Sequence, residues 1–442
     1  MLRTTAAVIA GKAARVATRL RGGGGSAFPG LVAERVDPAF LRNALAEVRG
    51  GIVVVSGTNG KTTTTKMLVA ILRAHGKVVF TNPTGSNFTR GVISAMLGEL
   101  PLGGRLHADL AVLELDEAHA LRFADAVAPT DALLLNVARD QLDRFAEIDH
   151  TAQLLARLAG QATRGVVLNV DDSYISRIAD GLADGVRVGW FGLDDSAKER
   201  LGELQEQDLR DATDVAPPST GPTDAFLTPL DARRFEMLFG RRGEGGRVGP
   251  LELHQRGLAA MINATAATAM ARTLLGDHFV SATAKAALQA MAPPFGRGEV
   301  IDVDGNPLEL VLVKNPAGFT VALGTYAAEH DEAPVATMIT INDLDADGRD
   351  VSWLYDVNFE SLRANGVALT SGLRAWDMAL RLEYDDVTVG AVEPDLNRAL
   401  DRFLAEHRDQ PKRIFCSYTT MMAMRRVLAD RYDLPEFGED AQ

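Results

Sequence analysis

Residues 51–65 read GIVVVSGTNGKTTTT, which is an apolar run, a glycine-rich turn and the start of a polar segment. We predict a strand over Ile52–Val55 and a helix over Met67–His75 on either side of that turn. Backbone N–H groups of such a turn face a phosphate, a lysine adds positive charge, and a threonine hydroxyl can bind Mg²⁺. The predicted phosphate-binding residues are Gly57, Thr58, Asn59, Gly60, Lys61, Thr62 and Thr63. The segment therefore predicts binding of ATP or a similar nucleotide with Mg²⁺, the alternative being an ordinary turn that contains Gly-Lys-Thr.

Apolar strands alternate with helical segments through most of the chain, which predicts an α/β fold with mostly parallel sheets. The first unit has strands at 52–55, 77–81, 110–114, 132–136 and 166–169, and later helices at 259–275 and 282–291. The second unit has strands at 308–313, 335–341, 366–370 and 413–417, and helices at 320–329, 359–365, 374–382 and 396–407. Ligands of open sheets bind beyond the carboxyl ends of the strands, so we predict a cleft between the units.

Composition shifts suggest where the domains divide. We predict an N-terminal helical segment over 1–45, an ATP-binding domain over 46–295 and a C-terminal domain over 296–442, with a boundary near Pro293–Gly296. Residues 193–250 are rich in Asp, Glu, Gly and Pro, and we interpret them as an inserted, partly mobile excursion. We expect no Cys-rich zinc site, because Cys416 is the only cysteine of the chain and lies outside this insert.

Charge and cysteine content narrow the class of protein. The formal net charge of −13 argues against a nucleic-acid partner, and the single Cys416 excludes internal disulfides. No apolar run reaches the ~20 residues of a membrane span. We therefore expect a cytoplasmic protein. The basic, acid-free segment 1–21 is either a helix on the inner membrane surface or, as we prefer, a helix docked on the protein with a solvated basic face.

Acidic and amide side chains follow several strands. Glu114 ends one strand and is our predicted second Mg²⁺ ligand beside Thr62. Asp116 and Glu117 follow it and are better interpreted as helix caps. Weaker candidates for a substrate-facing surface, each also compatible with an ordinary turn or cap, are 82–87, 136–144 and 169–172.

These motifs, in this order, resemble the Mur ligases and folylpolyglutamate synthases, which form amide bonds through an acyl phosphate. The resemblance covers nearly the whole chain and implies a Mur ligase-like central domain with a Rossmann-like C-terminal domain. It implies that Asn263 faces the adenine and that Arg297 lies near the terminal phosphate, where Arg297 and Lys61 would stabilise charge during catalysis. Lys314-Asn315-Pro316 stands where other members have His-Asn-Pro.

Departures from that pattern point to a subfamily. Gln141 and Lys314 each replace a histidine, Val311 replaces an aspartate, and no lysine lies between 144 and 163. The chain resembles instead the MurT ligase subunits, with matching segments at 115–117, 139–145, 314–318 and 342–353. The resemblance implies ATP-dependent amidation of the D-glutamate α-carboxylate of lipid II, with ammonia from a GatD-like glutamine amidotransferase in a heterodimer.

In that subfamily an aspartate of the ligase completes the partner's Cys–His–Asp triad. By motif position this residue is Asp350, with Asp356 as the second candidate, although Asp350 could simply cap its loop. Cys416 lies on an apolar strand and is predicted to be core. Trp353–Tyr355 is a predicted interface anchor. The alternatives are a conventional ligase that adds an amino acid and a non-catalytic nucleotide-binding scaffold.

Overall fold

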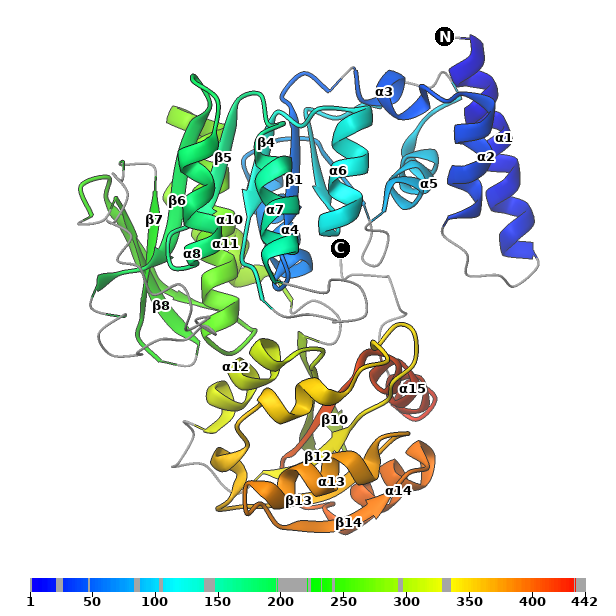
Figure 1. The fold of residues 1–442 in the computed structure, drawn as a ribbon, viewed down its shortest axis with the longest axis vertical. Coiled ribbons are helices and arrows are strands. Elements are labelled where there is room, and N and C mark those ends of the chain that lie inside the picture. Colours follow the sequence, from blue (N-terminus) through cyan, green and yellow to red (C-terminus); the bar gives the residue numbers. More distant parts are fainter. Residues whose placement is uncertain are drawn as a thin grey trace.

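The computed structural model forms two α/β units, one above the other in Figure 1. It describes residues 2–20, 27–46, 48–82, 88–102, 106–138, 148–195, 197, 221, 224–231, 233–240, 243–292, 297–327, 335–432 and 434. Each unit is built around its own sheet, and helices cover both faces of each. The predicted fold class is therefore confirmed, whereas the boundary expected at 293–296 lies outside the described residues.

The first unit contains a nine-stranded sheet in the order β2-β3-β1-β4-β5-β6-β7-β8-β9. Strands β1 to β7 are parallel, and β8 and β9 are antiparallel to their neighbours. The strands are β1 (Ile52–Ser56), β2 (Val79–Thr81), β3 (Leu110–Glu114), β4 (Asp131–Leu134), β5 (Gly165–Asn169), β6 (Arg187–Leu193), β7 (Ala225–Pro229), β8 (Arg234–Phe239) and β9 (Arg247–Glu252).

Helices pack on both faces of this sheet because β1 is buried on both sides. Ile52 and Val54 contribute to the core on one face, and Val53 and Val55 to the core on the other. The first core includes α1 (Leu2–Leu20), α2 (Phe28–Val36), α3 (Phe40–Leu45), α5 (Thr89–Glu99), α6 (Glu117–Ala126), α7 (Ile148–Ala159), α8 (Ser173–Ser176) and the 3₁₀ helix η1 (Arg177–Gly181). The second includes α4 (Lys61–Ala74), α10 (Leu258–Leu275) and α11 (Ser281–Ala290), with η2 (Gly276–His278) after α10.

The C-terminal unit has a six-stranded sheet in the order β10-β11-β15-β12-β13-β14. Only the edge strand β10 is antiparallel to its neighbour. Its strands are β10 (Arg297–Val303), β11 (Asn306–Leu312), β12 (Ala336–Thr340), β13 (Val367–Ser371), β14 (Val389–Glu393) and β15 (Lys412–Cys416). Its helices are α12 (Pro316–Ala327), η3 (Ser352–Asp356), η4 (Glu360–Leu362), α13 (Ala375–Tyr384), α14 (Leu396–Glu406) and α15 (Tyr418–Ala429).

Three expectations about local structure are wrong. Of the excursion predicted over 193–250, most of 196–223 lies outside the described residues, but the part from 225 onward adds β7, β8 and β9 to the sheet, where Phe235, Met237 and Phe239 are buried at alternate positions. The helix expected at 359–365 is only the short turn η4, because Phe359 is drawn into the core before it. In the predicted anchor, Trp353 and Leu354 are core residues and only Tyr355 is exposed.

Helix α10 and η2 together form a segment, Leu258–His278, that is long and apolar enough to cross a membrane by length and composition. In an apolar stretch of 18 residues within that segment, 61% is buried inside the protein. Helix α10 packs against α4 and the strands β5 to β7, so it serves as a core helix of the central unit.

Candidate active site

The turn between β1 and α4 adopts a backbone that requires glycine at two positions. Gly57 has φ 132° and Gly60 has φ 86°, a region that other residues rarely occupy. A Cβ at Gly60 would also lie only 2.3 Å from Oδ1 of Asn263 on α10. Helix α4 begins directly afterwards, at Lys61. The first N–H groups of α4 have no partner within the helix, and they are the groups that bind anions at such sites.

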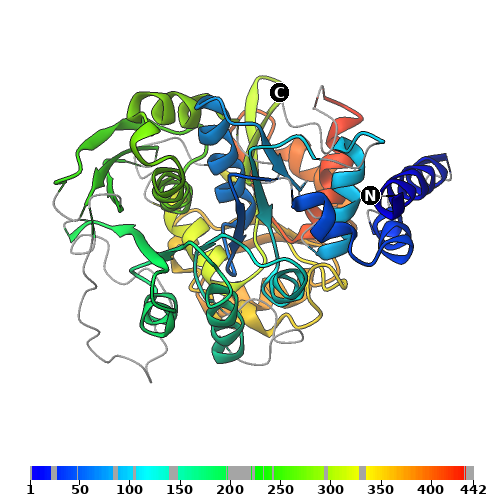
Figure 2. The ribbon, with the colours of Figure 1, turned by 90° about the horizontal axis from the view of Figure 1, so that it is seen from above.

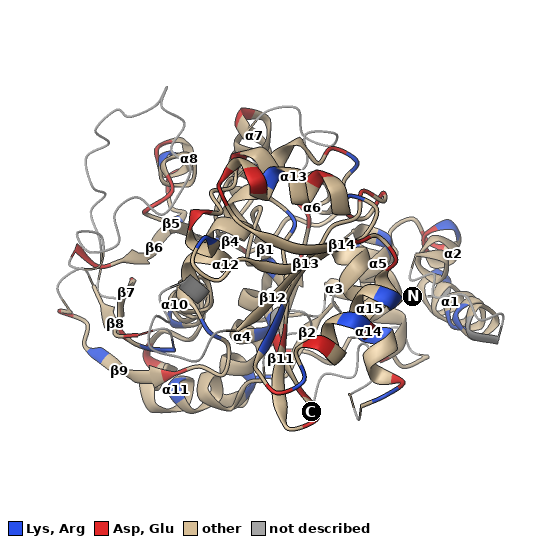
Figure 3. Cartoon of the chain, turned by 90° about the horizontal axis from the view of Figure 1, so that it is seen from below, with Lys and Arg blue, Asp and Glu red and all other residues tan. Residues whose placement is uncertain are grey.

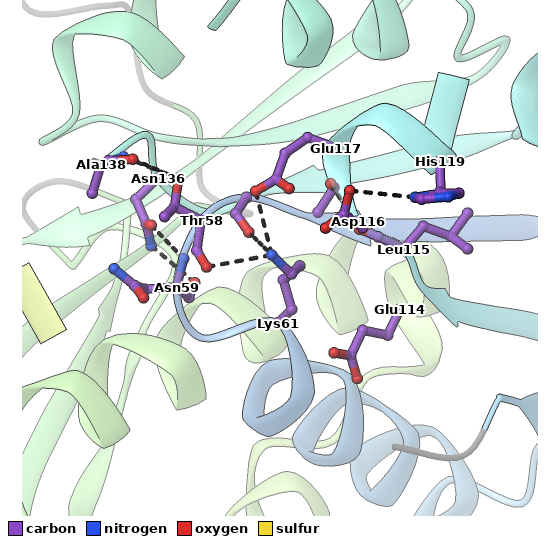
Figure 4. Close-up of polar contacts among 12 residues, drawn as sticks. Thr58, Asn59, Lys61, Glu114, Leu115, Asp116, Glu117, His119, Asn136 and Ala138 are labelled. Atoms are coloured by element: carbon purple, nitrogen blue, oxygen red, sulfur yellow. Dashed lines mark hydrogen bonds and ion pairs between the residues drawn. The ribbon is translucent and has the colours of Figure 1, made fainter. Parts of the chain in front are cut away.

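Lys61 is buried and folds back over the turn (Figure 4). Its Nζ donates to the carbonyl oxygens of Gly57 at 2.5 Å and Thr58 at 3.3 Å, and to Oε1 of Glu117 at 3.3 Å. Glu117 is 3% exposed and lies in the first turn of α6. The sequence suggested a helix cap for this residue, but the turn after β3 carries it to the phosphate loop. In the sequence, the signal for this role was an acidic residue three positions after Glu114.

Thr62 and Glu114 form a second buried pair. Thr62 Oγ1 donates to Glu114 Oε1 at 2.8 Å, and both side chains are less than 10% exposed. Asn82 fixes the end of β3, because its amide accepts from Glu114 N and donates to Glu114 O, each at 2.9 Å. A hydroxyl and a carboxylate are the hard oxygen donors that suit Mg²⁺, which keeps several waters and phosphate oxygens as further ligands. The donor set therefore fits Mg²⁺.

The segment after β4 runs beside the phosphate loop and holds it. Asn136 Oδ1 accepts from Asn59 N at 2.8 Å, and Asn136 Nδ2 donates to Asn59 O at 3.0 Å. Thr58 N donates to Asn136 O, while Thr58 Oγ1 and Ala138 exchange two hydrogen bonds. Thr58 and Asn59 are thus supports of the loop as well as predicted phosphate ligands. The neighbouring candidate residues 139–147 and 83–87 lie outside the described residues.

A cavity lies between the two units and opens onto this loop. The central unit lines it with loop, β5-end and α10 residues, and the C-terminal unit lines it with β11, Lys314 and α12. Asn263, the predicted adenine-facing residue, is 9% exposed and lines the cavity beside Gly60 and Thr63. Arg297 begins β10, where its backbone lies opposite Val311, another lining residue. Its side chain lies outside the described part of the structure.

Asn315 joins the C-terminal unit directly to the phosphate loop. Its Nδ2 donates to Asn59 Oδ1 at 3.0 Å, and its Oδ1 accepts from Gly318 N at 2.7 Å. Asn315 is fully buried and precedes Pro316, the first residue of α12, so it is the N-cap of that helix. The sequence showed an Asn-Pro pair here, but its contact with Asn59 spans 256 residues and had no local signal.

Asp172 anchors another part of the cavity wall. Its carboxylate accepts from Val137 N at 2.7 Å and from Tyr174 N and Ile175 N at 3.0 Å each. Burial raises the pKa of this carboxyl to about 6, although the three hydrogen bonds oppose the rise. Asp172 is therefore a helix cap that also fixes the segment after β4. A cap was one of the two interpretations that the sequence left open for 169–172.

Two further predicted residues lie in the C-terminal unit, away from the cavity lining. Asp350 is half-buried, and its Oδ1 accepts from the N–H of Ser352, the first residue of η3, at 2.8 Å. Asp356, the second candidate, is exposed.

Cys416 is completely buried, and burial raises the pKa of its thiol to about 12. The prediction that Cys416 is a core residue is confirmed.

A phosphate loop under a second α/β unit, with a cavity between them, is the arrangement of the ATP-dependent Mur-type ligases. Comparison with known families agrees. The chain belongs to the Mur ligase family, since residues 55–271 match the Mur ligase middle domain and residues 312–421 match the MurT ligase C-terminal domain.

Similar proteins extend over nearly the whole chain. The MurT subunit of lipid II isoglutaminyl synthase (glutamine-hydrolyzing) from Staphylococcus aureus strain COL is 29% identical over 421 residues, covering 90% of this chain and 92% of that protein. The Streptococcus pneumoniae R6 protein of the same name is 28% identical over 463 residues, covering 97% and 98%.

Solved structures share the fold at lower identity. MurF from Acinetobacter baumannii has a TM-score of 0.65 at 18% identity and covers 90% of this chain and 80% of its own. The structure of E. coli FolC with DHPP and ADP has a TM-score of 0.61 at 16% identity, covering 89% and 92%. These likenesses establish a Mur ligase fold, as the sequence predicted.

Proposed function

We propose that this protein is the ligase subunit of a lipid II isoglutaminyl synthase. It would use ATP to amidate the α-carboxylate of D-glutamate in lipid II, giving D-isoglutamine for peptidoglycan synthesis. The observation that carries the proposal is the buried cluster of Lys61, Thr62, Glu114 and Glu117 under a cavity closed by a MurT-type C-terminal unit.

The chemistry is transfer of the γ-phosphoryl group of ATP to a carboxylate oxygen, which releases ADP. Ammonia then attacks the acyl carbon, a C–N bond forms, phosphate leaves and the nitrogen loses a proton. Both steps develop charge on oxygen atoms, which fixed positive groups and N–H donors stabilise.

The residues of the site have distinct parts in this proposal. The amides of the loop bind the phosphates, and Lys61 would leave Gly57 O for a phosphate oxygen while keeping Glu117 as its counter-ion. Thr62 and Glu114 would hold Mg²⁺, whose charge offsets that of the phosphates when it is bound. Asn263 would contact the adenine, and Arg297 would reach the terminal phosphate from the C-terminal unit.

Glutamine hydrolysis has to come from another chain. A cysteine nucleophile must be an accessible thiolate, and Cys416, the only cysteine of the chain, is buried with a raised pKa. We therefore assign ammonia production to a partner of the GatD type. Asp350 supports this assignment, because among the described residues only its Oδ1 is hydrogen-bonded, which leaves Oδ2 for a partner's imidazole.

Helix α13 supplies a surface on which such a partner could dock. Four large apolar side chains are exposed on it or just before it: Leu373 at 62%, Trp376 at 67%, Leu380 at 49% and Tyr384 at 70%. The Tyr384 ring packs edge-on against Tyr355 of η3 at 6.1 Å between centroids. Contiguous exposed aromatic groups of this kind mark protein interfaces.

Arg381 makes α13 and η3 one rigid platform. This buried side chain donates to the carbonyl oxygens of Leu354 at 3.0 Å and Val357 at 2.5 Å, and it pairs with Asp385 at 2.8 Å. Asp350 accepts a hydrogen bond from the N–H of Ser352, the first residue of the same η3 turn. A partner bound to α13 would therefore meet Asp350 in a fixed position.

The deciding experiment measures ADP release and amidated product with lipid II and either glutamine or ammonium chloride, with the GatD-type subunit present. We expect turnover with both nitrogen sources. Stimulation by a free amino acid, with no response to ammonium, would instead identify a conventional amino-acid-adding ligase.

Two variants separate the roles of the subunits. Asp350→Asn should remove glutamine-dependent turnover and leave ammonium-dependent turnover intact, and equal loss with both donors would exclude Asp350 from the triad. Trp376→Ala should weaken co-elution with the partner on gel filtration while ammonium still works. Leu102→Ala, at a site 61% exposed in the other unit, is the matched control and should co-elute normally.

A further inference from the structure

Helix α1 has two apolar faces although it packs on only one side. Its inner face is buried and includes Thr4, Ala7, Val8 and Gly11. A Cβ at Gly11 would lie 2.5 Å from Leu97 of α5, and Thr4 Oγ1 donates to Asp37 Oδ2 at 2.9 Å. The helix is therefore docked, which is the interpretation that the sequence favoured. Docking explains the inner face but not the outer one.

The outer face is an apolar stripe that faces solvent. Its exposed members recur at three- and four-residue intervals, which places them on one side of the helix: Ala6, Ile9, Ala13, Val16 and Ala17. Ile9 is 53% exposed and Val16 is 58% exposed. Helix α2 adds Phe28, 52% exposed, and Val36, 38% exposed, so among the side chains that the structure describes the helix pair α1–α2 presents four large apolar ones to water.

The position of α1 leaves this face accessible. The α1–α2 pair lies at one end of the molecule, and α1 is the outer of the two helices (Figure 2). In Figure 3 the blue basic positions of α1 lie at the same end. A flat surface could approach α1 there without meeting the C-terminal unit.

The charge of this end is opposite to that of the rest of the chain. Residues 1–33 contain five of the 46 Lys and Arg residues and none of the 59 acidic ones, so the remaining residues carry a formal charge of −18. Arg3 is exposed and Lys12 is partly exposed, and both flank the stripe. An anionic surface would therefore be repelled by the net charge of residues 34–442 and attracted by the basic segment that forms α1.

We propose that the outer face of α1 binds an anionic lipid bilayer, with Ile9 and Val16 entering the interface and Arg3 and Lys12 contacting headgroups. Apolar side chains flanked by basic ones are the composition of helices that lie in the membrane surface. The consequence for catalysis rests on the proposed function: this contact would hold the enzyme at the membrane that carries its lipid-linked substrate. The binding itself does not depend on that function.

Co-sedimentation with vesicles tests the binding. We expect the full-length protein to bind vesicles containing phosphatidylglycerol, to bind phosphatidylcholine vesicles weakly, and to be released by high salt. The double variant Ile9→Asp/Val16→Asp should lower the affinity at least tenfold, and Arg3→Glu/Lys12→Glu should do the same. Val280→Asp is the matched control, since Val280 is 51% exposed near α11, and it should bind normally.

The outcomes are distinct. Equal vesicle binding by the wild type and both double variants would overturn the proposal. So would a wild type that ignores vesicles but forms dimers that Ile9→Asp/Val16→Asp abolishes, because α1 would then bind a second copy. Amidation of vesicle-embedded lipid II should fall in the double variants, whereas that of a water-soluble short-chain analogue should not. If the wild type turned over neither substrate, the proposed function would be refuted, but the vesicle-binding result would still stand.

Discussion

Replacing Asn315 tests whether the C-terminal unit positions the phosphate loop. Two hydrogen bonds of this buried side chain matter here, one within α12 to Gly318 and one across the cavity to Asn59. Asn315→Ser keeps an oxygen that can cap α12 but is too short to reach Asn59. Asn315→Ala removes both interactions. The pair of variants therefore separates the contact between units from the helix cap.

The structure gives the expected magnitudes. One buried neutral hydrogen bond contributes about 1 kcal/mol, so Asn315→Ser should cost about that in unfolding free energy. The lost cap adds about 1 kcal/mol more in Asn315→Ala. If the Asn59 contact stabilises the nucleotide-binding arrangement, each variant should also bind ATP about fivefold more weakly, because 1.4 kcal/mol is a factor of ten.

Urea denaturation and titration calorimetry with ATP would measure both quantities. The reasoning requires the two variants to differ in stability and to agree in nucleotide affinity. Wild-type ATP affinity in both would refute the idea that Asn315 positions the loop. Equal stability of the two variants would show that Asn315 does not act as a helix cap.

Three other variants probe the central unit. Lys61→Ala should abolish measurable ATP binding in calorimetry and all amidation, and intact binding would refute the phosphate-loop assignment. Gly60→Ala should lower the unfolding free energy by at least about 1 kcal/mol in urea, because φ is 86° and the new methyl group would meet Asn263. The Asp172 carboxyl, whose pKa is raised to about 6, binds its proton more tightly in the folded protein, so wild-type stability should fall as the pH rises through 4 to 6. The stability of Asp172→Asn should not show this pH-dependent fall, which amounts to up to about 3 kcal/mol. The variant should also be about 1 kcal/mol less stable at every pH, because it loses the hydrogen bond from Val137 N. Identical pH profiles of stability for the wild type and the variant would contradict the assigned pKa.

The sequence by itself determined the fold class and the centre of the site. Alternating apolar strands and helices predicted the parallel sheets, and the motif Gly57–Thr63 predicted the turn that leads into α4. These features are local, because glycine conformation, strand hydrophobicity and helix starts are set by residues a few positions apart. The same holds for Cys416, whose apolar strand predicted its burial.

Contacts between distant segments were decided only by the tertiary structure. Glu117 reaches Lys61 because β3 lies beside β1, and Asn315 reaches Asn59 because the two units close on one cavity. Strands β7 to β9 were not predicted, because they lie in a stretch of polar, glycine-rich composition. The alternating burial of their side chains is set by the sheet that they join. Trp353 likewise shows that burial depends on what packs above a residue, which no local pattern encodes.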